Sequence, residues 1–277
     1  MHMKDYYWGP VTSTIDWCEE NYTVSPYIAE FFNTVTNLSY ILLSLFGVYN
    51  VYHNKTSKTV YLSYLGIMFV GFGSWCFHMT LQYNMQLLDE LPMLYIACIM
   101  LWHTFIADPS STIGAKLPIG LAIYSILVSY AYIIINDPVF HQVAYGTLVV
   151  TVVCRAILLL NKVPAQRYLY ERAQMKTLLI LAAAGFIVGF TLWNIDNIFC
   201  LTLRDWRKTV PTLTGSVSEL HGWWHIGTAL GAYYFIVFCE WIRPVLYNKN
   251  ETYRLYWIGP ICYLRPTSSS DMKAKST

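Results

Sequence analysis

The chain has 277 residues, of which 56% are hydrophobic and only 12% are charged, with a net charge of +2. Soluble domains usually carry about 25% charged residues, so this composition excludes an ordinary soluble domain. The small net charge argues neither for nor against nucleic acid, and no nucleic-acid partner is expected. Apolar runs of about 20 residues recur along the chain, which predicts a polytopic membrane protein.

Seven apolar segments follow one another in the chain. The first 30 residues are polar and acidic and lack the apolar stretch of a cleavable signal peptide, so the first span should act as the insertion signal. The stretch 161–176 is basic and polar, and 201–218 is expected to be a loop. The predicted helices cover about 32–52, 60–81, 87–106, 117–135, 139–160, 177–199 and 219–242.

These spans predict an all-α, seven-helix transmembrane bundle. Residues 1–31 form an N-terminal segment, residues 32–242 the bundle and residues 243–277 a tail whose Ser- and Lys-rich end is typical of disorder. Four of the 18 Lys and Arg residues fall on the side of the N-terminus, and fourteen fall on the other side. Because positive charge favours the cytosol, we predict a lumenal N-terminus and a cytosolic C-terminus.

Three histidines lie at one depth in this topology. His221 and His225 stand four residues apart, so on a helix both rings project from one face. His78 lies at the lumenal end of the second predicted span. Three imidazoles leave a fourth position for water, as in catalytic zinc sites, where the pKa of bound water falls to about 7. We predict a Zn²⁺ site here, whereas His103 and His141 are interpreted as hydrogen-bonded core histidines.

Two polar residues accompany the histidines. Ser74 precedes His78 by four residues and shares its helix face, so it can help hold the substrate or its oxyanion. The alternative is a hydroxyl bonded to its own backbone. Asp89, at the lumenal start of the third span, can orient the metal-bound water and take its proton. The alternative is a carboxylate favoured there by the helix dipole.

The N-terminal segment carries hard oxygen donors. Asp16, Glu19, Asn21 and Glu30 lie within 15 residues, and Ca²⁺ prefers six to eight oxygen ligands. The segment lacks the glycine of an EF-hand loop, so a solvated acidic surface is an equal alternative. Asn21 also begins a glycosylation sequon, and cation binding there would disfavour a glycan. For residues 194–197 we favour hydrogen bonding between helices.

Seven cysteines are present, and two of them, Cys18 and Cys200, fall in predicted lumenal segments. The lumenal compartment permits disulfides. A bond between these two residues would tie the N-terminal segment to the chain that follows the sixth span.

Six segments together give the chain a likeness to a known family. They are, in chain order, YYWGPVTSTIDWCEENY, IAEFFNTVTN, GSWCFHMTLQYNMQLLDELPM, FHQVAYG, LWNIDNIFC and HGWWHI. With these segments, which run from residue 6 to about residue 230, the chain resembles the alkaline ceramidases, most closely those of the alkaline phytoceramidase type. The wider superfamily includes the adiponectin and progestin receptors.

The resemblance implies an intramembrane amidase that cleaves ceramide to a sphingoid base and a fatty acid. The substrate would be a phytoceramide, a dihydroceramide or an unsaturated long-chain ceramide drawn from the bilayer. The resemblance also implies a multi-pass protein of the endoplasmic reticulum, the Golgi apparatus or both. Matched residue by residue, it implies zinc ligands at His78, His221 and His225, catalytic Ser74 and Asp89, a calcium site from Asp16, the Trp17 carbonyl, Glu19, Asn21 and Glu30, and a disulfide between Cys18 and Cys200.

Two other classes of function compete with a zinc hydrolase. A seven-span receptor or sensor with a structural zinc would close its site with a fourth protein ligand. A transporter would usually show internal repeats or broken helices, and the sequence shows neither. The hydrolase is therefore the leading hypothesis.

Overall fold

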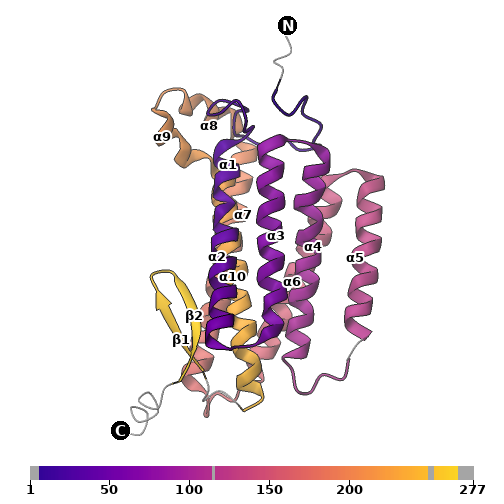
Figure 1. Cartoon of the computed structure of the whole chain (residues 1–277), viewed down its shortest axis with the longest axis vertical. Helices are drawn as coiled ribbons and strands as arrows, with labels where there is room; N and C mark the ends of the chain where they lie inside the picture. Colours follow the sequence, from indigo (N-terminus) through magenta and orange to yellow (C-terminus); the bar gives the residue numbers. More distant parts are fainter. Residues whose placement is uncertain (1–5, 114–115, 249–252, 268–277) are drawn as a thin grey trace.

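The computed structural model describes residues 6–113, 116–248 and 253–267. Seven helical segments in these ranges are long and apolar enough to cross a membrane, and they run side by side as a bundle (Figure 1). The predicted helical bundle is therefore confirmed. Its spans are α1 (Phe31–Thr36) with α2 (Leu38–Asn54), η1 (Lys58–Val60) with α3 (Tyr61–Thr80), α4 (Tyr83–Ile106), α5 (Lys116–Ile135), α6 (Pro138–Asn161), α7 (Leu169–Ile198) and α10 (Leu220–Leu246).

Three segments outside the predicted spans are more regular than the sequence analysis expected. The loop predicted at 201–218 is wrong, because this stretch contains α8 (Cys200–Arg207), α9 (Thr212–Gly215) and η2 (Ser216–Ser218). The basic stretch 161–176 is helical from residue 169, because charged residues such as Glu and Arg are good helix formers. The predicted tail begins inside α10, and its Ser- and Lys-rich end lies outside the described residues.

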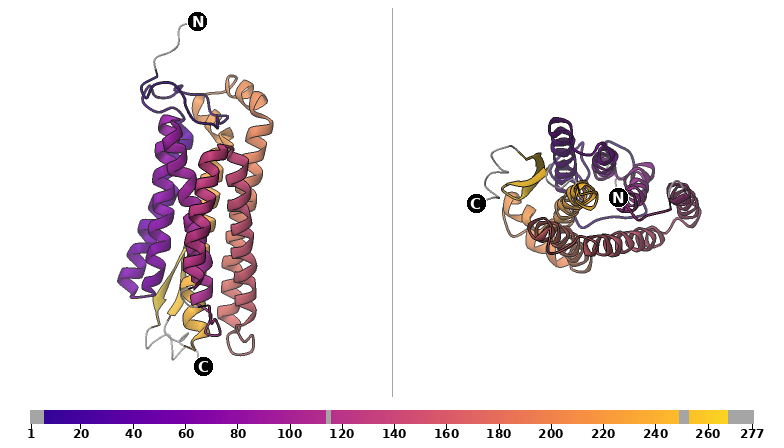
Figure 2. Two further views of the ribbon diagram at one scale, coloured as in Figure 1. Left: turned by 90° about the vertical axis from the view of Figure 1, so that its right-hand side faces the viewer. Right: turned by 90° about the horizontal axis from the view of Figure 1, so that it is seen from below.

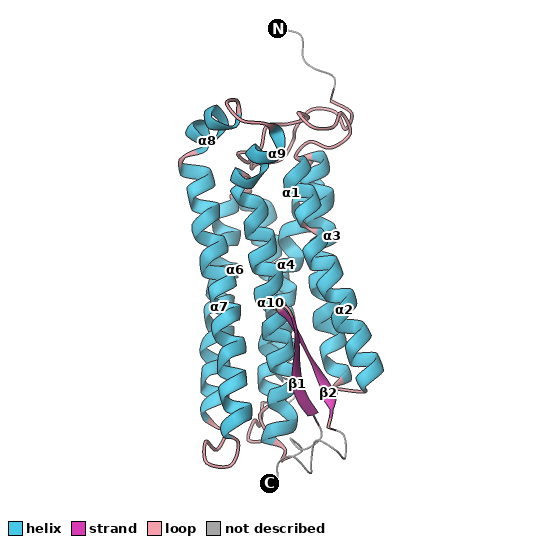
Figure 3. Ribbon diagram, turned by 90° about the vertical axis from the view of Figure 1, so that its left-hand side faces the viewer, coloured by secondary structure: helices cyan, strands magenta, loops and turns pink. Residues whose placement is uncertain are grey.

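The tail also contains a hairpin that the all-α prediction missed. Strands β1 (Tyr253–Ile258) and β2 (Ile261–Pro266) pair antiparallel between α10 and α2 (Figure 3). The hydroxyl groups of Tyr233 and Tyr234 on α10 each donate a hydrogen bond of 2.5 Å to a hairpin carbonyl, that of Cys262 and that of Pro260. An isolated two-stranded hairpin is marginally stable, so we attribute the order of this one to the helices behind it.

Helix α10 is the central helix of the bundle. In the most apolar stretch of α10, 78% of the residues are buried. The corresponding share is 11% for α5, which lies at the edge of the bundle (Figure 2). Small residues permit a close approach to α7, because a Cβ on Gly185 would lie 2.5 Å from the carbonyl oxygen of Gly227. Such small-residue contacts are typical of packed membrane helices. In the first turns of α10, His221 and His225 are each only 3% exposed.

The N-terminal segment lies across the ends of α3 and α4. Helix α3 ends at Thr80, and its C-cap residue Leu81 has a positive φ of 51°. The Leu81 carbonyl accepts the N–H groups of Thr12 at 3.2 Å and Ser13 at 3.1 Å. The side chain of Gln86 on α4 accepts the N–H of Thr14 at 2.8 Å. These bonds hold the segment over the end of the bundle that contains the predicted site.

Candidate active site

Three buried imidazoles meet where the end of α3 faces the start of α10. The ring centroid of His78 lies 5.0 Å from that of His221 and 4.8 Å from that of His225. The two α10 rings are 4.6 Å apart, and one nitrogen from each ring lies within 4.8 Å of the other two. Across the described ranges, no fourth His, Cys, Asp or Glu joins this group. The three predicted metal ligands are thus brought together.

Hydrogen bonds on Nδ1 hold two of the three rings. The Glu30 Oε2 atom lies 2.5 Å from Nδ1 of His78, and the Thr36 Oγ1 atom lies 2.9 Å from Nδ1 of His225. These contacts orient the rings and leave Nε2 of each for a metal, as is usual for metal-binding histidines. Nδ1 of His221 is buried without a hydrogen-bond partner in the described part of the chain. An orphaned nitrogen beside two oriented imidazoles fits a metal site.

Ser74 and Asp89 lie beside this group because α3 and α4 approach closely. A Cβ at Gly73 would stand only 2.2 Å from the carbonyl oxygen of Leu88. This contact brings the Ser74 hydroxyl within hydrogen-bonding reach of the Asp89 carboxylate. Both residues line the same cavity as the two α10 histidines. The structure therefore brings the two predicted catalytic side chains to the cavity that two of the predicted metal ligands line.

A cavity of about 730 Å³ opens at these residues, with walls from α3, α4, α6, α7 and α10. Its size is in the range of small-molecule sites, and most of its lining is apolar. Val143 and Val150 on α6 and Phe190 on α7 line the cavity and are also exposed on the outside of the bundle. The cavity thus extends to a face that bilayer lipid would cover.

Four features of the site were not predicted from the sequence. Thr36 holds His225, and Glu30, expected only as a calcium ligand, contacts His78. Glu90 and His141 line the cavity, although His141 was interpreted as a core histidine. A signal for the last two was present, because an ionisable residue inside a membrane span is by default a candidate for function.

Glu19 caps the first helix of the bundle. Its two carboxylate oxygens accept the N–H groups of Phe32 at 2.7 Å and of Asn33 at 2.8 Å. These amides belong to the first turn of α1 and have no partner within the helix. Burial raises the pKa of Glu19 to about 8, although the two hydrogen bonds oppose that shift. This predicted calcium ligand therefore also fixes the N-terminal segment to α1.

The other predicted calcium ligands include oxygens that lack a partner. Oε1 of Glu30 and the side-chain oxygen of Asn21 are buried without a hydrogen bond among the residues that the structure describes. Burial raises the pKa of Glu30 well above its usual value, and the nearby charge of Asp16 adds to this effect. Crowded acidic groups with orphaned oxygens fit a bound cation. The Trp17 carbonyl accepts a hydrogen bond from Arg204 at 3.1 Å, which leaves it a second lone pair.

The expected disulfide joins Cys18 to Cys200. It connects the N-terminal segment to the first residue of α8. The guanidinium group of Arg204, one turn further along α8, donates to the carbonyl groups of Cys18 at 2.9 Å and of Trp17 at 3.1 Å. A covalent bond and several hydrogen bonds thus fix the segment that covers the site.

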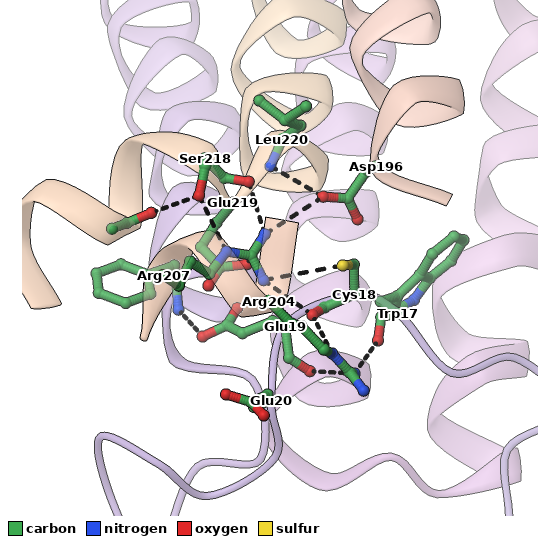
Figure 4. A network of polar contacts seen from close by, with 12 residues as sticks. Trp17, Cys18, Glu19, Glu20, Asp196, Arg204, Arg207, Ser218, Glu219 and Leu220 are labelled. Atoms are coloured by element: carbon green, nitrogen blue, oxygen red, sulfur yellow. Dashed lines mark hydrogen bonds and ion pairs between the residues drawn. The ribbon is translucent and has the colours of Figure 1, made fainter. Parts of the chain in front are cut away.

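An arginine whose side chain is 9% exposed connects the same segment to the start of α10 (Figure 4). The guanidinium group of Arg207 lies 2.9 Å from Oε2 of Glu219 and 3.7 Å from Oδ1 of Asp196. Oδ1 of Asp196 also accepts the N–H of Leu220 at 3.2 Å, so a side chain from α7 caps α10. The bonding between helices that was expected at 194–197 is found here. This cap lies immediately before the α10 histidines.

Comparison with known proteins identifies relatives along nearly the whole chain. A family model described as ceramidase matches residues 9–265. The chain is 44% identical to alkaline ceramidase 3 of Mus musculus over 262 residues, which cover 94% of this chain and 95% of that protein. It is 38% identical to alkaline ceramidase YPC1 of Saccharomyces cerevisiae, with 90% and 83% covered, and 30% identical to the alkaline ceramidase of Arabidopsis thaliana, with 94% of each covered.

Proposed function

The chain belongs to the ceramidase family, and we propose that it is a zinc-dependent intramembrane amidase that hydrolyses ceramide. The products would be a sphingoid base and a free fatty acid. The observation that supports this proposal is that three buried imidazoles come together and that two of them line an apolar cavity with Ser74 and Asp89. This arrangement supplies metal ligands, polar groups and room for lipid chains in one place.

The three imidazoles would hold the metal, with Nε2 of His78 and of His225 as two of the ligand atoms. A zinc ion there would supply Lewis-acid polarisation of the amide carbonyl and would lower the pKa of water. Glu30 and Thr36 keep the two oriented rings in position through Nδ1. No fourth protein ligand joins the group in the described residues, which favours a catalytic site over a closed structural one.

Asp89 and Ser74 perform the proton transfer and charge stabilisation in this proposal. Water adds to the amide carbon, and the Asp89 carboxylate takes the proton that the water releases. The Ser74 hydroxyl donates a hydrogen bond to the oxyanion that develops on the carbonyl oxygen. Asp89 then delivers its proton to the amine nitrogen as the carbon–nitrogen bond breaks. Base and acid roles therefore fall to one carboxylate.

The apolar cavity would receive the lipid chains from the bilayer. Val143, Val150 and Phe190 are shared by the cavity wall and the outer surface, so a lipid could reach the amide site between α6 and α7 without crossing water. The basic residues favour a lumenal N-terminus and a cytosolic C-terminus, and in that orientation the hydrolytic end would face the lumen. We propose a multi-pass location in the endoplasmic reticulum, the Golgi apparatus or both.

A calcium ion is the second proposed cofactor. Its ligands would be side-chain oxygens of Asp16, Glu19, Asn21 and Glu30 together with the Trp17 carbonyl. The buried orphaned oxygens of Asn21 and Glu30 support this set. Because the other Glu30 oxygen contacts His78, the cation would neutralise a carboxylate that also orients a metal ligand.

Hydrolysis of a labelled ceramide by the purified protein tests the proposed function. We expect turnover that is lost after treatment with a strong zinc chelator and restored by Zn²⁺. His78→Ala, His221→Ala and His225→Ala should each lower the zinc content and abolish turnover. His103→Ala is the matched control, because this buried histidine lies on α4 outside the cavity. Full activity of a protein shown to be metal-free would refute the zinc-dependent mechanism.

A further inference from the structure

A second polar cluster borders the cavity on the side of α5 and α6. Glu90 follows Asp89 directly in α4, and consecutive helical side chains point about 100° apart. Its Oε2 atom accepts a hydrogen bond from the Tyr132 hydroxyl and another, of 3.2 Å, from the Gln86 amide. Both bonds fall on Oε2, and within the described ranges none engages Oε1. Because Glu90 lines the cavity, its Oε1 atom is available there as a hydrogen-bond acceptor.

His141 on α6 is the second member of this cluster. Its imidazole lies within hydrogen-bonding reach of the Glu90 backbone carbonyl, and its ring centroid lies 5.3 Å from that of Tyr132. Only 2% of the residue is exposed, and its Nε2 is buried without a hydrogen-bond partner in the described part of the chain. In the neutral form of the ring, donation from Nδ1 to this carbonyl leaves an acceptor at Nε2.

We propose that Glu90 and His141 form a hydroxyl-binding subsite for the sphingoid backbone of the substrate, an inference that rests on the proposed hydrolysis of ceramide. In a ceramide, the carbons on either side of the one that carries the amide nitrogen bear hydroxyl groups. A hydroxyl therefore lies very close to the bond that is cleaved. Glu90 follows Asp89 in α4 and lines the same cavity, so it offers a recognition group in the cavity that would hold the reacting amide.

The chemistry of the cluster favours hydroxyl donors. A carboxylate oxygen and a neutral Nε2 are both acceptors, and the apolar lining around them has few groups that could satisfy them. A lipid that brings a hydroxyl to this cluster satisfies a buried acceptor, whereas a lipid without it leaves that acceptor unpaired. A site of this kind rejects the analogue that lacks the hydroxyl. Discrimination of about 10- to 100-fold in kcat/KM is expected for the loss of one such bond.

The test compares dihydroceramide with its 1-deoxy and 3-deoxy analogues of the same acyl chain. Wild-type protein should prefer dihydroceramide over at least one analogue by the factor stated above. His141→Phe removes the Nε2 acceptor and keeps the ring shape, and Glu90→Gln replaces the free oxygen by an amide group. Each variant should lower kcat/KM for dihydroceramide and leave the disfavoured analogue unchanged, so the ratio should fall towards one.

A matched control separates recognition from general damage to the fold. His103 is also a buried histidine whose Nε2 has no partner within the described residues, but it bonds to Ser63 and does not line the cavity. His103→Phe should retain the wild-type ratio even if stability falls. If His141→Phe does not yield folded protein, Glu90→Gln decides the question. Unchanged ratios in active variants would overturn the subsite, whereas a wild-type protein inactive on every ceramide would overturn the proposed function.

Discussion

The glycine at the contact between α3 and α4 offers a sharp test of the site geometry. In Gly73→Ala, the new Cβ would stand 2.2 Å from the carbonyl oxygen of Leu88, whereas ordinary contact begins at 3.4 Å. The two helices must separate locally by about 1.2 Å, because the obstacle is backbone and cannot rotate away. Overpacking of this kind typically destabilises a protein by about 1–3 kcal/mol. The displaced pair would be Ser74 and Asp89.

A misplacement of about 1 Å at a catalytic centre can lower the rate about 100-fold. We therefore expect Gly73→Ala to lower kcat on ceramide by about that factor while the zinc content stays near wild type, since no imidazole is changed. Gly120→Ala on α5 is the control, because nothing lies within 4 Å of its added Cβ. Metal analysis, thermal melting in detergent and steady-state kinetics provide the three readouts. Near-normal kcat in Gly73→Ala would show that the α3–α4 contact does not set the catalytic geometry.

Four further substitutions each test one contact or one proposed role. Asp89→Asn should retain zinc but lose about 10²- to 10⁴-fold in turnover, and near-normal activity would remove Asp89 from the proton-transfer role. Titration with Ca²⁺ should raise the melting temperature of the wild type, and Glu30→Gln should abolish this rise. A wild-type melting temperature that does not change with Ca²⁺ would exclude the calcium site. Cys18→Ser removes the disulfide to Cys200 and should lower the free energy of unfolding by up to roughly 5 kcal/mol in the chain-entropy model, because the closed loop is long. Peptide mapping of the wild type that recovers both thiols free would contradict the disulfide. Burial of Asp108 opposes its ionisation, but hydrogen bonds from two cations and a serine hold its pKa below the usual value. The ionised carboxylate therefore stabilises the fold above the unfolded pKa of about 3.9, and this contribution is lost on acidification. Asp108→Asn should thus lower the melting temperature at pH 7 by an amount that shrinks below about pH 4 in thermal scans, and a difference independent of pH would rule out the ion pairs as its cause.

The spans and the histidine group could be predicted because membrane physics acts locally on the sequence. The length of each apolar run fixes the depth of its end residues, so His78 and the α10 histidines could be placed at one level. Helical periodicity then put His221 and His225 on one face. Neither rule requires knowledge of which helices are neighbours.

Contacts that depend on helix neighbours could not be predicted in the same way. The contacts of Glu90 with Tyr132 and His141 require α4, α5 and α6 to be adjacent. Hydrophobic periodicity does not predict which helices are neighbours. The hairpin was missed for a related reason, since its stability comes from packing against α10 and α2 and not from its own residues. Helix α8 is short and amphipathic, so it lacked the apolar signal on which the spans were recognised.

The arrangement of the site covers its end of the bundle and leaves a lateral approach for a lipid. The N-terminal segment covers the end of the bundle, where the Trp17 ring stacks on His221 with centroids 4.1 Å apart. The cavity instead opens sideways, where Phe190 contributes to both wall and outer surface. A lipid can therefore approach from the membrane without displacing the segment. A segment fixed by the Cys18–Cys200 bond shields the imidazoles from bulk water, and electrostatic interactions in such a shielded site are stronger than in solvent.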